Sequence, residues 1–312
     1  MKKGHKILLR IGIAVVIFLI TFTIVTKIVV GSTKPAYLHI ESGSVEVNTG
    51  SGWQTAEDGM SLSKKDSVRT GENGEAIVIL YDSSFINLEP NTEITIEQLS
   101  KSNTKVKQDS GETWNKFSKI TGMSGYEVET PNTVATIRGT EFLINADEEK
   151  IIVVEGIVDY KYGNITVKIK EFEKYIKGEK LELTAEEKNM LLERIKKGIE
   201  IQKEVRANRM DRMRAVDWAR KNYVIEHGEN MSKEEQLRTF LDAVDQGKVD
   251  DRKILKKIPL INKHPSAKQF IAFNDEIKEQ EERLRNLKGT QKEKVEQIDV
   301  QISDNNVVSI EQ

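Results

Sequence analysis

The sequence predicts a single N-terminal transmembrane helix, then an all-β domain built as a sandwich or a solenoid, then an α-helical domain. Three observations predict this order: an uncharged apolar run near the N-terminus, apolar residues at period two in the middle, and a charged region with helix-capping motifs at the end. The length of 312 residues allows about two domains. The absence of cysteine excludes disulfides, thiolate metal sites and a cysteine nucleophile.

Residues 7–30 form the predicted transmembrane helix, and residues 1–6 its cytoplasmic tail. Only Arg10 and Lys27, near the two ends of the run, are charged. About 20 helical residues cross the hydrocarbon core of a bilayer, so the run is long enough. The basic residues before it place the N-terminus in the cytoplasm and the C-terminus outside a cell membrane. The alternative is a signal peptide cleaved near residues 29–31, which would also export the rest of the chain.

The predicted β-domain spans residues 37–183. Its short runs of β-branched residues alternate with polar ones and stop at Gly, Asn, Asp or Pro, which is typical of strands with one buried face. The runs are residues 45–47, 76–80, 86–88, 94–96, 126–128, 140–144, 151–154, 157–160 and 165–169. Because no helical pattern separates them, a doubly wound parallel sheet is not expected.

An ordered series of motifs in this region carries a family resemblance. The series is GSVEV at 43–47, Trp53 with Gly59, DSVRT at 66–70, INLEPNT at 86–92, Gly111-Glu112, VETP at 128–131, ATIRGTEF at 135–142 and VEGIV at 154–158. It resembles the FecR family domain, the extracytoplasmic β-domain named after the ferric-citrate regulator. The resemblance implies a module that binds, senses or regulates outside the membrane.

The best-known members of that family regulate a sigma factor through a cytoplasmic domain that precedes the membrane helix. Here about ten residues, Met1 to Arg10, stand before the apolar run, too few to bury a core. We therefore expect the sigma-regulating activity to be absent from this chain.

Eight residues of these motifs are candidates for a structural or partner-binding role. Pro131 fixes φ, Gly139 permits a positive φ, and Trp53 is expected to pack in the core with Trp114, each with its N–H bonded to a carbonyl. Arg138 has five donors, which suit a clamp on loop carbonyls or a contact with a ligand. The full set is Trp53, Asp66, Arg69, Thr70, Pro131, Arg138, Gly139 and Thr140.

The predicted helical domain covers residues 184–303, and residues 304–312 form a polar, frayed tail. Two Ser/Thr-x-x-Glu capping boxes begin helices, at Thr184 and at Ser232. The predicted helices span residues 185–226, with a kink or break near Gly198 and residues 200–212, then 232–247, and then 266–288 with Gly289 as its C-cap.

Two features of the helical region suggest partners. A weak heptad pattern over residues 266–300 fits either packing within the chain or self-association. A basic cluster with aromatics, from Arg206 to Lys221, fits either a solvated face or an anionic envelope polymer or lipid headgroups. The expected location outside the cytoplasm argues against nucleic acid.

No catalytic motif stands out. The four histidines lack metalloprotease spacing, and there is no nucleophile elbow or phosphate-binding loop. We expect no enzyme activity, no cofactor and no metal. The expected function is a binding, sensing or regulatory module with a protein or envelope-polymer partner. The alternatives are a structural envelope assembly protein that uses its C-terminal helices, and an unrecognised envelope-polymer hydrolase.

Overall fold

The computed structural model describes residues 12–21, 34–118, 120, 122–137, 139–211, 231–256 and 268–288. The chain divides into two compact units. The larger comprises Pro35–Val205 with Asp275–Gln312, and the smaller comprises Met1–Lys34 with Arg206–Asn274. The strands end at Leu181 and the first long helix begins at Ala185. The predicted helical region is therefore divided between the units: its residues up to Val205 and from Asp275 belong to the larger unit, and Arg206–Asn274 belong to the smaller one.

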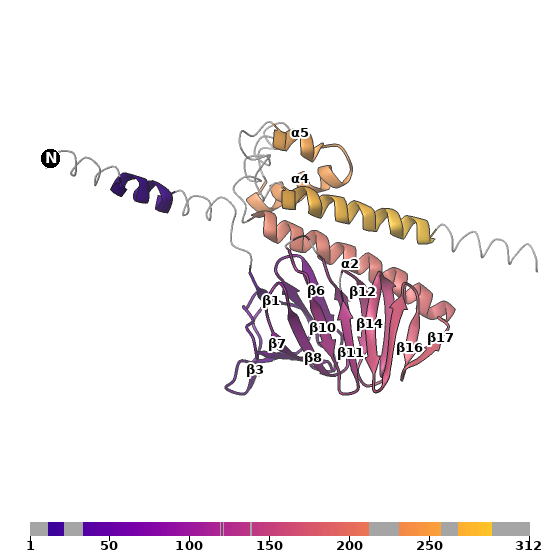
Figure 1. The fold of residues 1–312 in the computed structure, drawn as a ribbon. Coiled ribbons are helices and arrows are strands. Elements are labelled where there is room, and N and C mark those ends of the chain that lie inside the picture. The colour runs from indigo at the N-terminus through magenta and orange to yellow at the C-terminus, as the bar shows by residue number, and fades with distance from the viewer. Residues whose placement is uncertain are drawn as a thin grey trace, which may run out of the picture. The chain divides into compact units, whose positions relative to one another are not determined.

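Two β-sheets form the body of the larger unit (Figure 1). The eight-stranded sheet has the order β1 (Ala36–Ser42), β5 (Glu75–Leu80), β6 (Ser84–Leu88), β9 (Glu112–Lys116), β12 (Glu141–Asn145), β13 (Lys150–Glu155), β16 (Lys174–Ile176) and β17 (Glu179–Leu181). The nine-stranded sheet has the order β15 (Ile165–Lys170), β14 (Ile157–Tyr162), β11 (Thr133–Ile137), β10 (Tyr126–Glu129), β8 (Thr104–Ser110), β7 (Glu93–Gln98), β4 (Ser67–Thr70), β2 (Val45–Asn48) and β3 (Trp53–Thr55).

The two sheets share one core, so the domain is a sandwich, the first of the two architectures that the sequence left open. Val78 and Leu80 of one sheet and Val106, Val128 and Tyr160 of the other belong to the same buried cluster. Strands β8 and β10 pair in parallel, whereas hairpin partners such as β12 and β13 are antiparallel. Each of the nine predicted strand runs lies in an observed strand to within one residue.

The eight-stranded sheet is buried on both faces. In β5, Val78 and Leu80 face the nine-stranded sheet, while Ile77 and Ile79 belong to a second cluster on the opposite face. This explains why β5 reads as an unbroken apolar run, whereas β7 and β10 of the nine-stranded sheet alternate buried and half-buried residues.

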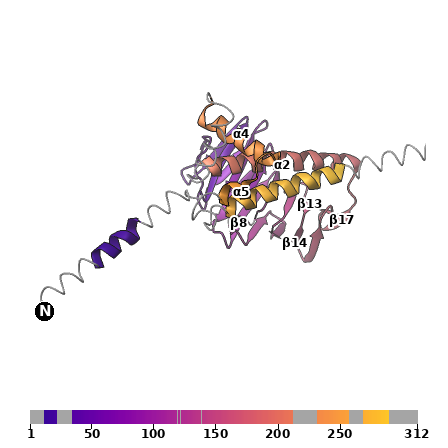
Figure 2. The same ribbon diagram turned by 90° about the horizontal axis from the view of Figure 1, so that it is seen from above.

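Helices cover that second face. Helix α2 (Ala185–Asp211) and the helical residues 275–288 lie alongside one another on the eight-stranded sheet (Figures 1 and 2). The capping box predicted at Thr184 is confirmed, because the Glu187 amide donates to Thr184 Oγ1 at 3.2 Å and the Thr184 amide donates to Glu187 Oε2 at 2.8 Å. The break predicted near Gly198 is wrong, since α2 is continuous from Ala185 to Asp211.

The smaller unit contains the last turns of α2, α4 (Lys233–Asp245), α5 (Asp251–Lys256) and helical residues 268–274. Ser232 caps α4 with the predicted capping box. Arg206 is buried and donates to both carboxylate oxygens of Asp245, at 2.6 and 2.7 Å, and to Asn274 Oδ1 at 2.9 Å. This bidentate pair ties the end of α2 to two other helices.

The predicted transmembrane segment 7–30 is described only at residues 12–21, which are helical. Within the described ranges, no helix combines the length and the apolar character needed to cross a bilayer. Two other predictions lie partly outside these ranges: the basic cluster from Arg206 to Lys221 is described only to Asp211, and the self-association segment 266–300 only at residues 268–288.

Candidate functional site

The candidate site is the face of the eight-stranded sheet that α2 covers, where side chains far apart in the sequence make polar contacts. Its centre is apolar: Ile77, Phe85 and Trp114 of the sheet pack against Leu191 and Ile195 of the helix. Charged side chains surround this centre. Burial of the apolar residues supplies most of the attraction, and the charged pairs fix how the helix lies.

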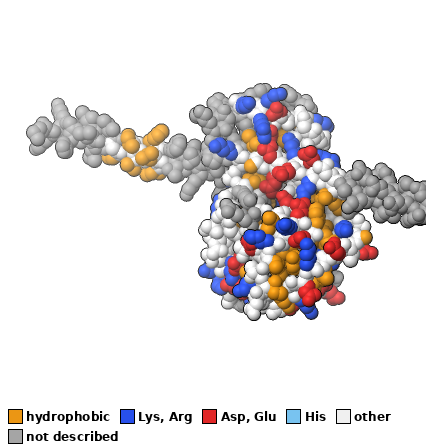
Figure 3. All heavy atoms as spheres, turned by 45° about the vertical axis from the view of Figure 1, so that its right-hand side comes forward, with side chains coloured by type: hydrophobic (Ala, Val, Ile, Leu, Met, Phe, Trp, Pro, Cys, Tyr) orange, Lys and Arg blue, Asp and Glu red, His pale blue; other side chains and the backbone are white. Residues whose placement is uncertain are grey.

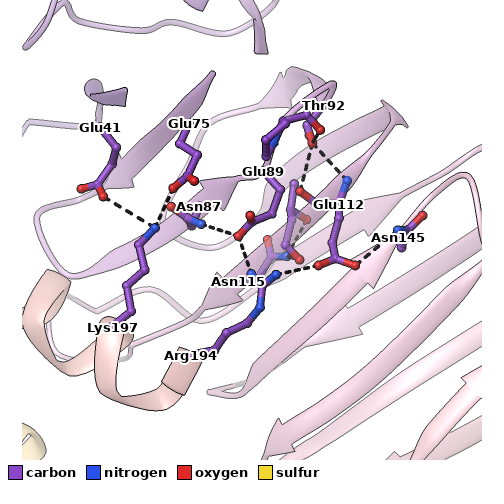
Figure 4. A network of polar contacts seen from close by, with 12 residues as sticks. Glu41, Glu75, Asn87, Glu89, Thr92, Glu112, Asn115, Asn145, Arg194 and Lys197 are labelled. Carbon is purple, nitrogen blue, oxygen red and sulfur yellow. Dashed lines mark hydrogen bonds and ion pairs between the residues drawn. The ribbon is translucent and has the colours of Figure 1, made fainter. Parts of the chain in front are cut away.

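Arg194 makes the principal charged contact (Figure 4). Its Nη2 donates to Glu112 Oε1 at 2.8 Å, and its Nη1 donates to Glu89 Oε1. All three side chains are only about one-fifth exposed, and the guanidinium carbon lies 5.7 Å from the centre of the Trp114 ring. One guanidinium therefore joins the end of β6 to the start of β9.

Lys197, one turn further along α2, continues the pattern. Its Nζ donates to Glu75 Oε2 at 2.9 Å and lies 3.6 Å from Glu41 Oε2. Burial lowers the pKa of the Lys197 ammonium, but the bond to Glu75 and the charges of the nearby carboxylates together outweigh burial, so the pKa is raised overall. The sheet thus presents a row of four carboxylates, Glu41, Glu75, Glu89 and Glu112, to two cations of α2 (Figure 4).

Two threonines hold the backbone beneath this row. Thr70 Oγ1 donates to the Glu89 carbonyl at 2.7 Å and accepts from the Thr92 amide at 3.0 Å. Thr92 Oγ1 donates to the Glu112 carbonyl and accepts from the Glu112 amide, both at 3.0 Å. A Cβ at Gly111, whose φ is 75°, would overlap Thr92. The two threonines therefore hold the backbone of Glu89 and of Glu112, the two residues whose carboxylates Arg194 bridges.

The side-chain amides of two asparagines orient the carboxylates of Glu89 and Glu112. Asn87 Nδ2 donates to Glu89 Oε1 at 3.0 Å, and Asn145 Nδ2 donates to Glu112 Oε2 at 3.3 Å (Figure 4). The carboxylates therefore keep their positions through contacts within the sheet as well as through Arg194.

A buried charge cluster lies beneath helical residues 275–288. Lys116 Nζ donates to Glu141 Oε2 at 2.7 Å and to Glu155 Oε2 at 2.8 Å. Glu276 accepts from Ser118 Oγ at 2.9 Å and from Gln202 Nε2 at 2.7 Å. This cluster fixes the second helix to the sheet as Arg194 fixes the first.

Burial controls the protonation of this cluster. It raises the pKa of Glu276 and of Glu141, against the lowering effect of Lys116. Burial alone would lower the pKa of Lys116, but Glu141 and Glu155 raise it overall. The lysine therefore stays charged, while the two carboxyls hold their protons to higher pH than free glutamates.

Gly198 sets the distance between α2 and the sheet. A Cβ at this position would lie 3.3 Å from Glu141 Oε1, 3.7 Å from the Phe85 ring and 3.8 Å from Trp114 Nε1. The residue predicted to break the helix instead lies within it and against the sheet, where a larger side chain would press on these three residues. Trp114 Nε1 has no bond partner among the described residues, in contrast to the predicted bond to a carbonyl.

The structure places the predicted site residues in several locations. Thr70 lies in the site, as described above. Asp66 Oδ2 accepts from the Ser63 amide at 2.7 Å and closes a turn. On the nine-stranded sheet, the Arg69 guanidinium carbon lies 4.2 Å from the centre of the Trp53 ring, so Trp53 is half-buried rather than part of the core.

The other candidates lie around the β11–β12 connection. Pro131 is exposed, and Gly139 has the positive φ expected of it, 72°. Thr140 is buried and its carbonyl accepts from the Phe117 amide at 2.9 Å. Arg138 lies outside the described residues, so its two predicted roles stay predictions.

Sequence reasoning missed Arg194 and Lys197 altogether. One signal was available: both are basic residues next to the apolar positions Leu191, Ile195 and Ile199 of α2, on the side that meets the sheet. Across the described residues, no cluster of three or more His, Asp and Glu side chains could hold a metal ion.

Comparison with known proteins assigns the sheet part of this site. Residues 66–159 match the family model described as FecR protein. The chain contains a FecR domain. Thr70, Glu89 and Glu112 lie within the matched residues, whereas Arg194 and Lys197 follow them in the sequence. Helix α2 therefore lies outside the matched residues and packs on the sheet that contains them.

No curated protein matches this chain. Two crystal structures, at 1.65 Å and 2.50 Å resolution, of a protein from Parabacteroides distasonis ATCC 8503 described provisionally as an anti-sigma factor are similar to it, with 18% sequence identity and a TM-score of 0.33. Each similarity covers 37% of this chain and 57% of that chain. The chain thus spans little more than half the length of that protein.

Proposed function

We propose that this chain is a membrane-anchored regulatory module whose FecR domain binds or senses a partner outside the membrane and passes the change to α2. One observation carries the proposal: Arg194 of α2 joins two carboxylates of the FecR domain, Glu89 and Glu112. The Glu89 amide donates to the Glu112 carbonyl at 3.0 Å, so Arg194 bridges two neighbouring positions of the sheet and responds if these positions move apart.

The route of the change runs through the loops of the FecR domain. Residues 89–92 and 110–112 carry the two carboxylates and are bonded to each other through Thr92. A partner that shifts either loop displaces one carboxylate and weakens the bidentate contact of Arg194. Helix α2 supplies its residues up to Val205 to the larger unit and those from Arg206 to the smaller one, so one helix connects both units.

Membrane anchoring is the second part of the proposal. The apolar residues 7–30, with basic residues before them, support a helix that keeps the N-terminus in the cytoplasm and the FecR domain outside. Protease treatment of intact cells that express the chain with a different tag at each end tests this topology. We expect loss of the C-terminal tag and retention of the N-terminal one. Retention of both tags would contradict an extracytoplasmic location.

The proposed partner is a protein or an envelope polymer rather than nucleic acid, and the proposed role is not enzymatic. Direct control of a sigma factor is not part of the proposal, because the FecR match covers residues 66–159 only. An assembly role through the C-terminal helix is less favoured, since Ile277 is buried and Leu284 and Leu287 pack on the chain's own sheet.

Hydrogen exchange tests the sensing role. The purified full chain is mixed with separated protein and polymer fractions of the cell envelope, and exchange is followed at the amides of residues 186–205. We expect one fraction to change the protection of these amides in the wild-type chain but not in Arg194→Met. If every fraction leaves the wild-type helix unchanged while the chain sediments as a defined oligomer, the assembly role replaces the sensing role.

A further inference from the structure

The nine-stranded sheet ends at β15, and no described strand lies beyond it. The other described sheet edges are protected or short. The free side of β1 is bonded to the loop between β3 and β4, where the Leu38 amide donates to the Met60 carbonyl at 2.9 Å and the Leu62 amide donates to the Ala36 carbonyl at 3.0 Å. Strands β3 and β17 have three residues each, whereas β15 has six. A free edge of this length is unusual, because it can pair with any extended chain.

The free side of β15 offers backbone groups at alternate residues. The Lys170 amide donates to Glu173 Oε2 at 2.8 Å, so Lys170 turns its backbone away from β14. In an antiparallel ladder the same direction recurs at every second residue, here Lys168 and Thr166. In the described part of the chain, the amides of these two residues meet no acceptor.

The side chains of β15 form two rows. Ile165, Val167 and Ile169 face the sandwich core, and Thr166, Lys168 and Lys170 face outward. Ile169 is buried, but Ile165 is 43% exposed even though its Cδ1 lies close to Gly178 in the turn between β16 and β17. Figure 3 shows exposed apolar side chains among charged ones on the side of the larger unit that holds β14–β17. An added strand with one apolar and one polar row would complete this end.

One segment of the chain has that composition. Residues 298–302 read Ile-Asp-Val-Gln-Ile and lie outside the described residues. We propose that residues 298–302 add to the edge of β15 as an antiparallel tenth strand. The register that aligns the two apolar rows pairs Ile169 with Ile298, Lys168 with Asp299, Val167 with Val300, Thr166 with Gln301, and Ile165 with Ile302.

The charges and the backbone agree with this register. Lys168, which already contacts Asp159 at 2.5 Å, gains a second carboxylate from Asp299. Opposite charges directly across two strands stabilise their pairing. The free amides of Lys168 and Thr166 become the hydrogen-bonded positions of the new ladder. A lysine on an edge strand disfavours pairing with a strand that has no acidic residue opposite it. Lys168 therefore favours residues 298–302, which place Asp299 opposite it.

The segment can reach the edge. Arg283 bonds to the Val154 carbonyl and to Glu171, and its guanidinium carbon lies 5.6 Å from the centre of the Phe172 ring. Glu171 and Phe172 directly follow β15, so the helical residues that end at Lys288 approach the Lys170 end of the strand. The nine residues 289–297 span up to about 30 Å, longer than the roughly 20 Å of β15. Entry at the Lys170 end makes the added strand antiparallel.

Disulfide formation tests the register, because the wild-type chain has no cysteine. The full chain with Ile165→Cys and Ile302→Cys is oxidised mildly and compared with Ile165→Cys and Gln301→Cys, whose side chains would lie on opposite faces. We expect an intramolecular disulfide to form at least tenfold faster in the first pair. Equal rates in the two pairs, or a disulfide that joins two chains, would overturn the proposal, the second result assigning the edge to another copy.

A second experiment removes the segment. We expect the amides of Thr166 and Lys168 to exchange at least tenfold faster in a chain that ends at Gly289 than in the full chain. Added to the chain with Ile165→Cys and Ile302→Cys, Asp299→Lys should slow disulfide formation several-fold, while the matched change Asp304→Lys should not. Unchanged exchange after truncation would mean that the edge of β15 is free or is kept for another protein.

Discussion

Arg194 of α2 and Glu112 of β9 form a hydrogen-bonded ion pair of 2.8 Å, although 82 residues separate them in the sequence. Glu112 belongs to the part of the chain that matches the FecR model, and Arg194 does not. The pair therefore joins the matched residues to a helix that follows them in the sequence. The same guanidinium also holds Glu89, so the contact reports the spacing of two strands.

Arg194→Met should destabilise the larger unit. The change leaves Glu89 and Glu112 without their shared cation, in a site about one-fifth exposed. Loss of a partner costs about 3–5 kcal/mol in a buried pair and about 0–1 kcal/mol at the surface, which predicts about 2 kcal/mol here. Urea unfolding followed by tryptophan fluorescence measures the loss. The matched Arg238→Met, in an exposed pair with Glu234, should cost less than about 0.5 kcal/mol, and equal losses would argue against a special role for Arg194.

Thr70→Val should weaken the support beneath the site. The substitution keeps the shape of the side chain but removes the hydroxyl that bonds to the Glu89 carbonyl and the Thr92 amide. Two buried backbone groups lose a partner, at a cost of about 1–3 kcal/mol. Thr70→Ser keeps the hydroxyl and should retain most of the stability. A serine variant as unstable as the valine variant would show that the methyl group matters instead.

Substitutions at Gly198 should depend on size. Alanine improves helix propensity by about 1 kcal/mol, but its Cβ presses on Glu141 Oε1, so we expect a net change under about 1 kcal/mol. Leucine cannot fit between α2 and Phe85 and should cost about 3 kcal/mol or more. Thermal unfolding of both variants, with Glu200→Leu on the exposed side of α2 as control, measures the difference. Tolerance of leucine would mean that α2 does not approach the sheet closely.

Stability should fall as pH rises through the range in which Glu276 and Glu141 lose their protons. Burial raises both pKa values above the ordinary 4.5, so the folded chain holds these protons to higher pH than the unfolded chain. The stabilisation is complete below about pH 4.5 and is lost as pH rises to the raised pKa values. Glu155, whose pKa is lowered, contributes the opposite slope below pH 4.5.

Glu276→Gln isolates one of these groups. The amide cannot ionise, so the variant should be more stable than the wild type at pH 8 and similar to it at pH 5. Urea midpoints at the two pH values measure this, with Glu279→Gln, on the exposed side of the same helix, as control. Parallel pH profiles for wild type and Glu276→Gln would rule out the buried carboxyl as the source of the slope.

Two of the strands that the sequence did not predict, β8 and β9, have polar residues among those that face the core. In β9, Thr113 and Asn115 point between the sheets, where Asn115 bonds to Tyr126 Oη at 2.8 Å and Thr113 bonds to Gln108 Oε1 at 2.7 Å. Because this buried network replaces apolar contacts, hydrophobic periodicity is absent from β8 and β9. The same reasoning applies to Glu112, which was visible only as part of a family motif.

The helical region shows the other limit of sequence analysis. Capping boxes predicted the starts of α2 and α4, because a cap depends on residues three positions apart. The docking of α2 on the sheet depends on residues more than 80 positions apart, such as Arg194 and Glu112, which no local pattern connects. An unbroken apolar strand such as β5 is typical of a strand buried on both faces, but the pattern does not identify the element that covers it.

Hydrogen exchange of the full chain tests most directly whether Arg194 couples α2 to the FecR domain. Exchange is compared among wild type, Arg194→Lys and Arg194→Met at the amides of α2 and at those of residues 89–92 and 110–112. The account predicts faster exchange in both regions for Arg194→Met, with Arg194→Lys in between. Faster exchange in α2 alone, with the two loops unchanged, would show that the helix rests on the FecR domain without being coupled to it.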